Sequence, residues 1–253
     1  LKSQVQQAIN NPSDEVGVKT KNLNLWCDTE QIWIPSIRIL PQIQKIDLDD
    51  FVNREDYQTY VGVDLAATSD LTALSFLVTN GDNYFVKNYY FVPQTALTDK
   101  SNKELYKEWS SHNHLIVTPG NVTDYDYLTN FLMEYQEKLH IQSIGYDKWN
   151  ATQWAIKCTE LGLPLIEYPQ NIGSFNAPTK ELERLILNGT LFIDKNPINR
   201  FCFDNVVLKS DWNGNVKPNK NTNDKKIDGV IAMIEALGVY LRVPHYSNEI
   251  LTI

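Results

Sequence analysis

Three aspartates stand at the ends of apolar segments, and they are the residues of this chain best suited to chemistry. Asp64 follows the apolar run Tyr60–Val63. Asp147 follows a second such run, and Asp228 opens an amphipathic segment. Carboxylates are the ligands that Mg²⁺ and Mn²⁺ prefer in proteins, and two such ions can clamp the attacking water and the leaving oxygen of a phosphodiester. We therefore predict that the three carboxylates converge on divalent ions and cut nucleic acid.

Asp64 carries this prediction most directly. It interrupts an apolar strand, and a buried acid is costly unless it is paired or bound to metal. A ligand held on a strand is also rigid. The small neighbours Gly62 and Ala66 would let a phosphate backbone approach. These features favour a functional role for Asp64 over a structural one.

Each of the other acids also has a simpler, purely structural interpretation. Asp147 could be an ordinary residue at a strand end beside Lys148. Asp228 could be an acid that the helix dipole favours at a helix N-terminus. Asp70 is interpreted as a turn residue, with support of the site as a second option. The grouping of Asp64, Asp147 and Asp228 therefore depends on a fold that brings them together.

The predicted elements form a mixed α/β sheet. Three strand-like runs at 60–64, 72–78 and 84–91, joined by short turns, predict an antiparallel meander. Helices and strands then alternate. Helices are predicted at 103–110, 124–140, 150–162, 178–188 (with Pro178 in its first turn) and 227–241, and strands at 115–118, 141–147, 165–168, 191–194 and 206–210. This order implies parallel strands beside the meander and helices on both faces of the sheet.

Charge and composition exclude several classes of protein. The 253 residues carry a net charge of −8, which by itself argues against nucleic-acid binding. The three cysteines have no paired spacing, which fits a reducing compartment and excludes a cysteine-based zinc site. The sequence shows no signal peptide and no run long enough to span a membrane. The start at Leu1 without Met suggests a piece of a longer protein.

One local stretch reverses this acidic balance. Residues 209–226 are rich in lysine and lead directly to Asp228. Such a segment could follow a phosphate backbone without reading bases, or it could simply be a solvated loop. The DNA-binding candidates are Lys217, Lys220, Lys225 and Lys226. Weak, salt-sensitive DNA binding is expected.

In order and spacing, the motifs resemble those of the large terminase subunit of tailed bacteriophages. They are Val-Gly-Val-Asp64-Leu-Ala-Ala-Thr-Ser-Asp, Gly-Tyr-Asp147-Lys-Trp-Asn-Ala and Lys-Ile-Asp228-Gly-Val-Ile-Ala-Met. The resemblance covers most of residues 57–243 and continues weakly into residues 1–56. It implies an RNase H-like nuclease domain at 57–243, a linker or tail of an upstream packaging ATPase at 1–56, and a C-terminal tail at 244–253.

The same resemblance implies an activity and its partners. Asp64, Asp147 and Asp228 would hold two Mg²⁺ or Mn²⁺ ions and cut concatemeric double-stranded DNA, with Asp70 in a supporting place. The expected partners are DNA, the packaging ATPase domain, the small terminase subunit and the portal, in the cytoplasm of an infected bacterium and away from membranes. No Gly-x-x-x-x-Gly-Lys-Ser/Thr motif occurs, so this chain is not expected to pump DNA.

Three other functions stay open from the sequence. Actin-like ATPases and sugar kinases share an Asp-containing hairpin, but Ala66 and Ala67 stand where their phosphate loop needs glycine. A docking module for the portal or capsid would carry the acids without using them. A Holliday-junction resolvase would share the fold but require a dimer and branched DNA.

Overall fold

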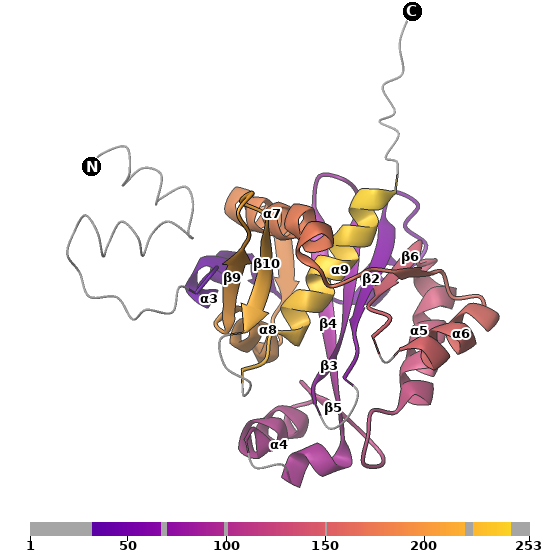
Figure 1. Ribbon diagram of the computed structural model, residues 1–253. Helices are drawn as coiled ribbons and strands as arrows, with labels where there is room; N and C mark the ends of the chain where they lie inside the picture. Colours follow the sequence, from indigo (N-terminus) through magenta and orange to yellow (C-terminus); the bar gives the residue numbers. More distant parts are fainter. Residues whose placement is uncertain (1–31, 67–69, 99–100, 150, 221–224, 244–253) are drawn as a thin grey trace, which may run out of the picture.

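The structure is a computed structural model that describes residues 32–66, 70–98, 101–149, 151–220 and 225–243 (Figure 1). Residues 1–31 of the expected linker and the expected tail at 244–253 lie outside the described residues. Within the described part, no helix is long and apolar enough to cross a membrane.

A mixed eight-stranded sheet forms the centre of the described structure. Its order is β1-β8-β4-β3-β2-β6-β7, and β5 also pairs with β4. The pairs β2–β3 and β3–β4 are antiparallel, whereas β6, β7, β8, β5 and β1 each pair in parallel. This confirms the predicted meander and the mixed sheet. The strands are β1 (Ile43–Gln44), β2 (Gln58–Asp64), β3 (Thr72–Thr79), β4 (Tyr84–Pro93), β5 (Ile116–Thr118), β6 (Ser143–Tyr146), β7 (Leu165–Glu167) and β8 (Leu191–Asp194).

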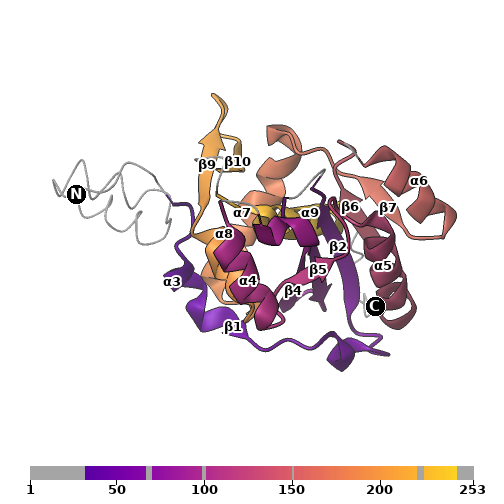
Figure 2. The same cartoon turned by 90° about the horizontal axis from the view of Figure 1, so that it is seen from below.

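Helices cover both faces of this sheet, as predicted. One core contains residues of α4, α7, α8 and α9, and the other contains residues of α5 and α6. Figures 1 and 2 show α9 lying against β2 with α7 alongside it, and α5 and α6 grouped on the other side. The helices are α3 (Ser36–Ile39), α4 (Lys103–Ser111), α5 (Tyr125–Leu139), α6 (Thr152–Glu160), α7 (Ile172–Asn188), α8 (Pro197–Phe203) and α9 (Asp228–Arg242), with short 3-10 turns at Leu40–Gln42, Leu48–Phe51 and Gln94–Thr98.

Alternation along β2 decides which face Asp64 occupies. Side chains of a strand point to opposite faces in turn. Tyr60 belongs to the core under α9, whereas Val61 and Val63 belong to the core under α5 and α6. Asp64 is therefore on the same face as α9.

The helix α7 begins earlier than predicted. The sequence placed its start at Pro178, but the helix begins at Ile172, and the side chain of Asn171 caps it by accepting from Ser174 N at 2.9 Å. Pro178 has no N–H for the carbonyl of Ser174, four residues before it. The hydroxyl of Tyr168 donates to that carbonyl at 2.7 Å instead. This tertiary hydrogen bond compensates for the proline inside the helix.

Four of the described α-helices and strands were absent from the prediction: α3 and β1 in the segment before residue 57, strand β10 and helix α8. Strand β10 (Val216–Lys220) pairs antiparallel with β9 (Val206–Ser210) and forms a separate hairpin. Pro218 lies within β10, and proline in a sequence normally argues against a strand; a two-stranded hairpin tolerates it because both strands are edges. Helix α8 follows β8 directly, with Pro197 at its first position.

Residues before 57 contribute to the same core. Trp33, Ile34 and Ile39 are buried among residues of α7, α8 and α9. Strand β1 extends the sheet by pairing with β8. The domain division at residue 56 stays a prediction, but part of the segment before it is packed on this sheet.

Candidate metal centre

Two glycines let α9 lie directly on the sheet. A Cβ at Gly62 of β2 would stand 1.9 Å from the carbonyl oxygen of Ala232, and one at Gly145 of β6 would stand 3.1 Å from the carbonyl oxygen of Glu235. Only a residue without a side chain fits at Gly62. This close approach brings the acids of α9 to Asp64, at the end of β2.

Asp64 and Glu235 share one hydrogen-bond donor. Nε2 of Gln170, in the loop between β7 and α7, lies 3.1 Å from Oδ1 of Asp64 and 3.1 Å from Oε1 of Glu235. Glu235 is fully buried in the middle of α9. Helical side chains lean toward the N-terminus, so Glu235 reaches back along α9 toward the strand end. Two carboxylates are thus held together by a neutral amide.

Asp228 is the first residue of α9 and faces the same space as Asp64. A cavity of about 250 Å³ is lined by Asp64, Asp228 and Gln170, and by Lys217 and Lys220 from β10. The Oδ2 atom of Asp228 is buried and has no hydrogen-bond partner among the described residues. The hairpin β9–β10 therefore closes one side of a cavity that has carboxylates on the other.

Burial and mutual repulsion raise the pKa values of these acids. Burial first, and then the charge of Asp228, raise the pKa of Asp64 to about 8. Burial and then the charge of Asp70 raise the pKa of Asp228 to about 6. Burial and the charge of Asp64 raise the pKa of Glu235 well above its ordinary value. Burial and the repulsion between these acids therefore outweigh the effect of the nearby lysines on their pKa values.

The donor set fits a hard divalent cation. Asp64, Asp228 and Glu235 offer carboxylate oxygens, and Oε2 of Glu235, like Oδ2 of Asp228, has no hydrogen-bond partner among the described residues. Such oxygens are the ligands of Mg²⁺ and Mn²⁺, and bound ions favour the ionised form of an acid. Among the described residues, no three His, Cys, Asp or Glu side chains are already spaced to hold one metal ion. Side-chain adjustment would thus have to accompany binding.

Asp147 lies at the neighbouring strand end. Val63 of β2 and Tyr146 of β6 are register partners in a parallel pair, so the chain places Asp147 beside Asp64. Its charge contributes to raising the pKa of both Asp64 and Glu235. Its Oδ1 accepts from Trp149 N at 3.4 Å, and it does not line the cavity. The adjacent strand ends that the sequence suggested are present.

The buried Lys226 forms an ion pair with the partly exposed Asp70 next to Asp228. Lys226 is 8% exposed and contacts Oδ1 of Asp70, which also accepts from Leu71 N at 2.8 Å. The charge of Lys226 lowers the pKa of Asp228, against the effect of Asp70. Lys226 is therefore a buried residue whose charge acts on the carboxylates of Asp70 and Asp228, and it is not part of a solvated loop.

The other predicted lysines occupy different positions. Lys217 and Lys220 line the cavity, and Nζ of Lys217 donates to the main-chain oxygen of Gln170 at 2.8 Å. Lys225 is half-buried and does not line the cavity. Two of the four DNA-binding candidates thus face the carboxylates across the cavity.

Glu235 and Gln170 were missed by reasoning from the sequence. Glu235 has a signal in the sequence, because it is the one acid inside the apolar run Val230–Val239. A lone acid on a fully buried stretch of helix requires a partner or a ligand. Gln170 has no comparable signal, because it lies in a short polar segment between Pro169 and Asn171.

The sequence is similar to known proteins over nearly all of its length. The family profile "Terminase large subunit, endonuclease domain" matches residues 1–243. The large terminase subunit of Enterobacteria phage HK97 is 30% identical over 184 residues, which cover 71% of this chain and 36% of that protein. Protein YmfN of Escherichia coli strain K12 is 28% identical over 264 residues, which cover 98% of this chain and 56% of that protein. The chain thus spans about a third to just over half of these relatives.

Solved structures share the fold. The crystal structure of the HK97 bacteriophage large terminase matches with a TM-score of 0.72 and 26% identity, over 94% of this chain and 49% of that chain. The large terminase nuclease of the thermophilic phage G20c matches with a TM-score of 0.52 and 13% identity, over 73% of this chain and 83% of that chain. At 13% identity, the match to the G20c nuclease shows a shared fold and nothing more. This fold is the RNase H-like arrangement expected from the sequence.

Proposed function

Because the chain belongs to the terminase large-subunit family, whose endonuclease domain it matches over residues 1–243, we propose that it is a metal-dependent endodeoxyribonuclease that hydrolyses double-stranded DNA. The observation that carries this proposal is the convergence of Asp64, Asp228 and Glu235, whose burial and mutual repulsion the nearby lysines do not offset. Their pKa values are raised by burial and by one another. A site built in this way is suited to divalent cations.

Each residue has a distinct task in this proposal. Asp64, which faces both α9 and the cavity, would hold two Mg²⁺ or Mn²⁺ ions together with Asp147 and Asp228. When bound, the ions lower the pKa of the attacking water and stabilise the departing oxygen. Gln170 holds the carboxylates of Asp64 and Glu235 in place through its amide. Glu235 supplies a further carboxylate behind Asp64.

The lysines would act on the DNA phosphate. Lys217 and Lys220 line the cavity opposite Asp64 and Asp228. Their ammonium groups can neutralise the non-bridging oxygens of the phosphate at the cavity. Lys226 would act indirectly, through its ion pair with Asp70 beside Asp228.

The biological process in which this nuclease acts is also a proposal. The relatives are longer than this chain, and one of them is the large terminase subunit of phage HK97. We propose that the domain cuts concatemeric DNA during genome packaging in the cytoplasm of an infected bacterium. A packaging ATPase would precede it in the whole protein, joined through residues 1–56, and the small terminase subunit and the portal would be its partners.

Cleavage assays on supercoiled plasmid and linear DNA test the activity. Cutting is expected with Mn²⁺ or Mg²⁺ and is expected to stop with EDTA, because the carboxylates need the ions to activate water. Activity restricted to branched DNA would identify a resolvase instead. Absence of cutting on every substrate, together with binding to a portal or capsid protein, would contradict the nuclease proposal.

The lysine arrangement predicts how DNA binding responds to salt. Replacing Lys217 and Lys220 by alanine should weaken DNA binding and reduce the slope of log K against log salt by about two, because each lysine releases about one counterion. Binding is measured by fluorescence anisotropy in EDTA, so that cleavage does not interfere. The control replaces Lys138 and Lys157, exposed lysines on α5 and α6, by alanine. Equal slopes for both variants would remove β10 from the DNA-binding surface.

A further inference from the structure

Two strands share one edge of β4 and leave a gap between them. Strand β8 pairs with Tyr84–Val86 and β5 pairs with Phe91–Pro93. Among the described strands, none pairs with Lys87–Tyr90 on that edge. A cavity of about 310 Å³ occupies the gap. This volume is at the lower end of the range of small-molecule pockets.

Positively charged and imidazole side chains gather around this cavity. Lys45, Lys87 and Lys195 line it, and His112 and His114 line it from the segment that precedes β5. These residues come from separate parts of an acidic chain with a net charge of −8. Among the described residues, neither Lys45 nor Lys195 forms an ion pair. The cavity therefore contains lysine charge that no described carboxylate pairs with.

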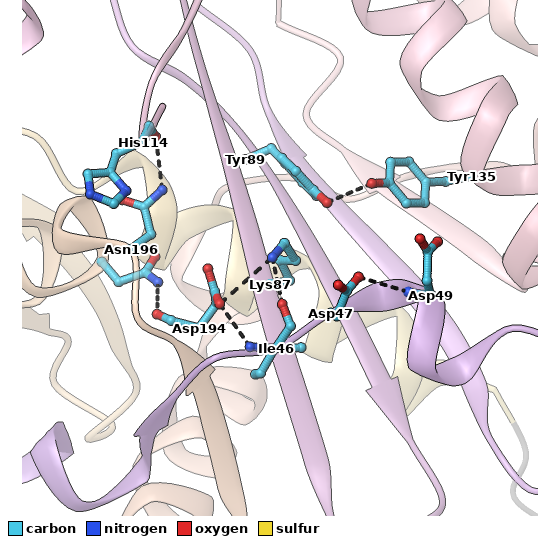
Figure 3. A network of polar contacts seen from close by, with 10 residues as sticks. Ile46, Asp47, Asp49, Lys87, Tyr89, His114, Tyr135, Asp194 and Asn196 are labelled. Carbon is cyan, nitrogen blue, oxygen red and sulfur yellow. Dashed lines mark hydrogen bonds and ion pairs between the residues drawn. The ribbon is translucent and has the colours of Figure 1, made fainter. Parts of the chain in front are cut away.

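The one acid that lines the cavity is already engaged. Oδ1 of Asp194 accepts from Ile46 N at 3.0 Å and lies 3.8 Å from Nζ of Lys87 (Figure 3). Nζ of Lys87 also donates to the main-chain oxygen of Ile46 at 2.6 Å. Figure 3 also shows Asp47 and Asp49 nearby; they do not line the cavity, and Asp47 accepts from Asp49 N at 3.2 Å. Asp194 is thus paired with Lys87, and no other carboxylate among the described residues lines the cavity.

Buried amides form the polar wall of the cavity. Asn196 is 9% exposed, and its Nδ2 donates to the main-chain oxygen of His114 at 2.9 Å. Asn88 is 2% exposed, and its Nδ2 lies 3.0 Å from Oδ1 of Asn199. The Oδ1 atom of Asn88 is buried and has no hydrogen-bond partner among the described residues. Because Asn88 also lines the cavity, rotation of its amide would present this acceptor to a bound molecule.

We propose that this cavity binds a phosphate ester that also carries a hydrogen-bond donor, as a nucleotide does. Lys45, Lys87 and Lys195 would bind the phosphate, since lysine is a point charge suited to phosphate. The amide of Asn88 would accept from a hydroxyl or amino group of the same molecule. No residue lines both this cavity and the one between Asp64 and Asp228. The site is thus distinct from the candidate metal centre and does not depend on the nuclease proposal.

Calorimetric titration in EDTA and low salt tests the site, with pyrophosphate, dAMP and a short DNA duplex as three separate probes. Low salt limits screening, and EDTA prevents metal at the acidic centre from binding the phosphate. At least one probe is expected to bind. The double variant Lys45→Ala, Lys195→Ala should weaken that binding by about tenfold or more, because hydrogen bonds to charged groups are lost.

The double variant Lys138→Ala, Lys157→Ala is the matched control, because it removes the same charge from α5 and α6. It should bind the probes like the unmodified protein, and circular dichroism should show both variants folded. Binding of pyrophosphate or dAMP would identify a small free ligand, whereas a duplex effect alone would identify the DNA backbone as the source of the phosphate. Absence of binding by all three probes, or equal weakening in both double variants, would overturn the proposal.

Discussion

Replacing Asp64 with asparagine should reduce DNA cleavage in Mn²⁺ or Mg²⁺ by about a thousandfold or more, because a neutral amide is a much poorer ligand of a divalent cation than a carboxylate. Asp64 is the acid that combines a rigid strand position, contact with Gln170 and a place in the cavity. Initial rates of plasmid nicking measure the effect. The control is Asp82→Asn, which removes the same charge from the exposed turn between β3 and β4.

The same variant should affect stability in the opposite direction. The pKa of Asp64 is raised in the folded state from its ordinary 3.8 to about 8. The metal-free folded protein therefore holds this proton more tightly than the unfolded chain, and its stability falls as pH rises from about 4 to about 8. Asparagine avoids that loss, so the melting temperature of Asp64→Asn in EDTA should exceed that of the unmodified protein at pH 8.

These two measurements separate a metal ligand from a structural residue. A variant that loses both cleavage and stability would show that Asp64 supports the fold instead of the chemistry. A variant that still cuts at the normal rate would remove Asp64 from the site. Loss of cleavage with a raised melting temperature is the result expected here.

Replacing Gly62 with alanine should destabilise the protein by about 3 kcal/mol or more, at or above the upper end of the usual cost of overpacking a core. The added Cβ would lie 1.9 Å from the carbonyl oxygen of Ala232 and 2.5 Å from the amide nitrogen of Ala236. Both are backbone atoms, so no side chain can move aside. The helix α9 would have to shift away from β2, carrying Asp228 and Glu235 away from Asp64. Chemical denaturation measures the stability, and plasmid nicking measures the accompanying loss of cleavage.

The control for this prediction is Gly173→Ala in the first turn of α7. A Cβ there meets only Oδ1 of Asn171, at 3.3 Å, which belongs to a side chain. This variant should retain stability to within about 1 kcal/mol, because alanine suits a helix better than glycine does. If Gly62→Ala is as stable as Gly173→Ala, α9 does not lie on β2 as the structure shows.

The strands and the helix that carry the acids of the site could be predicted from the sequence, because the patterns that indicate them lie in neighbouring residues. The runs that end at Asp64 and Asp147 predicted strands, and parallel pairing of β2 with β6 places those strand ends side by side. The apolar face that begins at Asp228 predicted α9. The early start of α7 could not be predicted from Pro178, because the hydroxyl that compensates for the proline comes from Tyr168, outside the helix.

The sequence by itself determined most of the strands and helices, the positions of the acids at their ends, and the family of the chain, because apolar periodicity and motif spacing are properties of neighbouring residues. Only the tertiary structure decided that Gln170 joins Asp64 to Glu235 and that Lys226 pairs with Asp70. Gln170 and Glu235 lie 106 and 171 residues along the chain from Asp64. Contacts over such separations depend on how closely α9 approaches β2, and the space at Gly62 sets that approach.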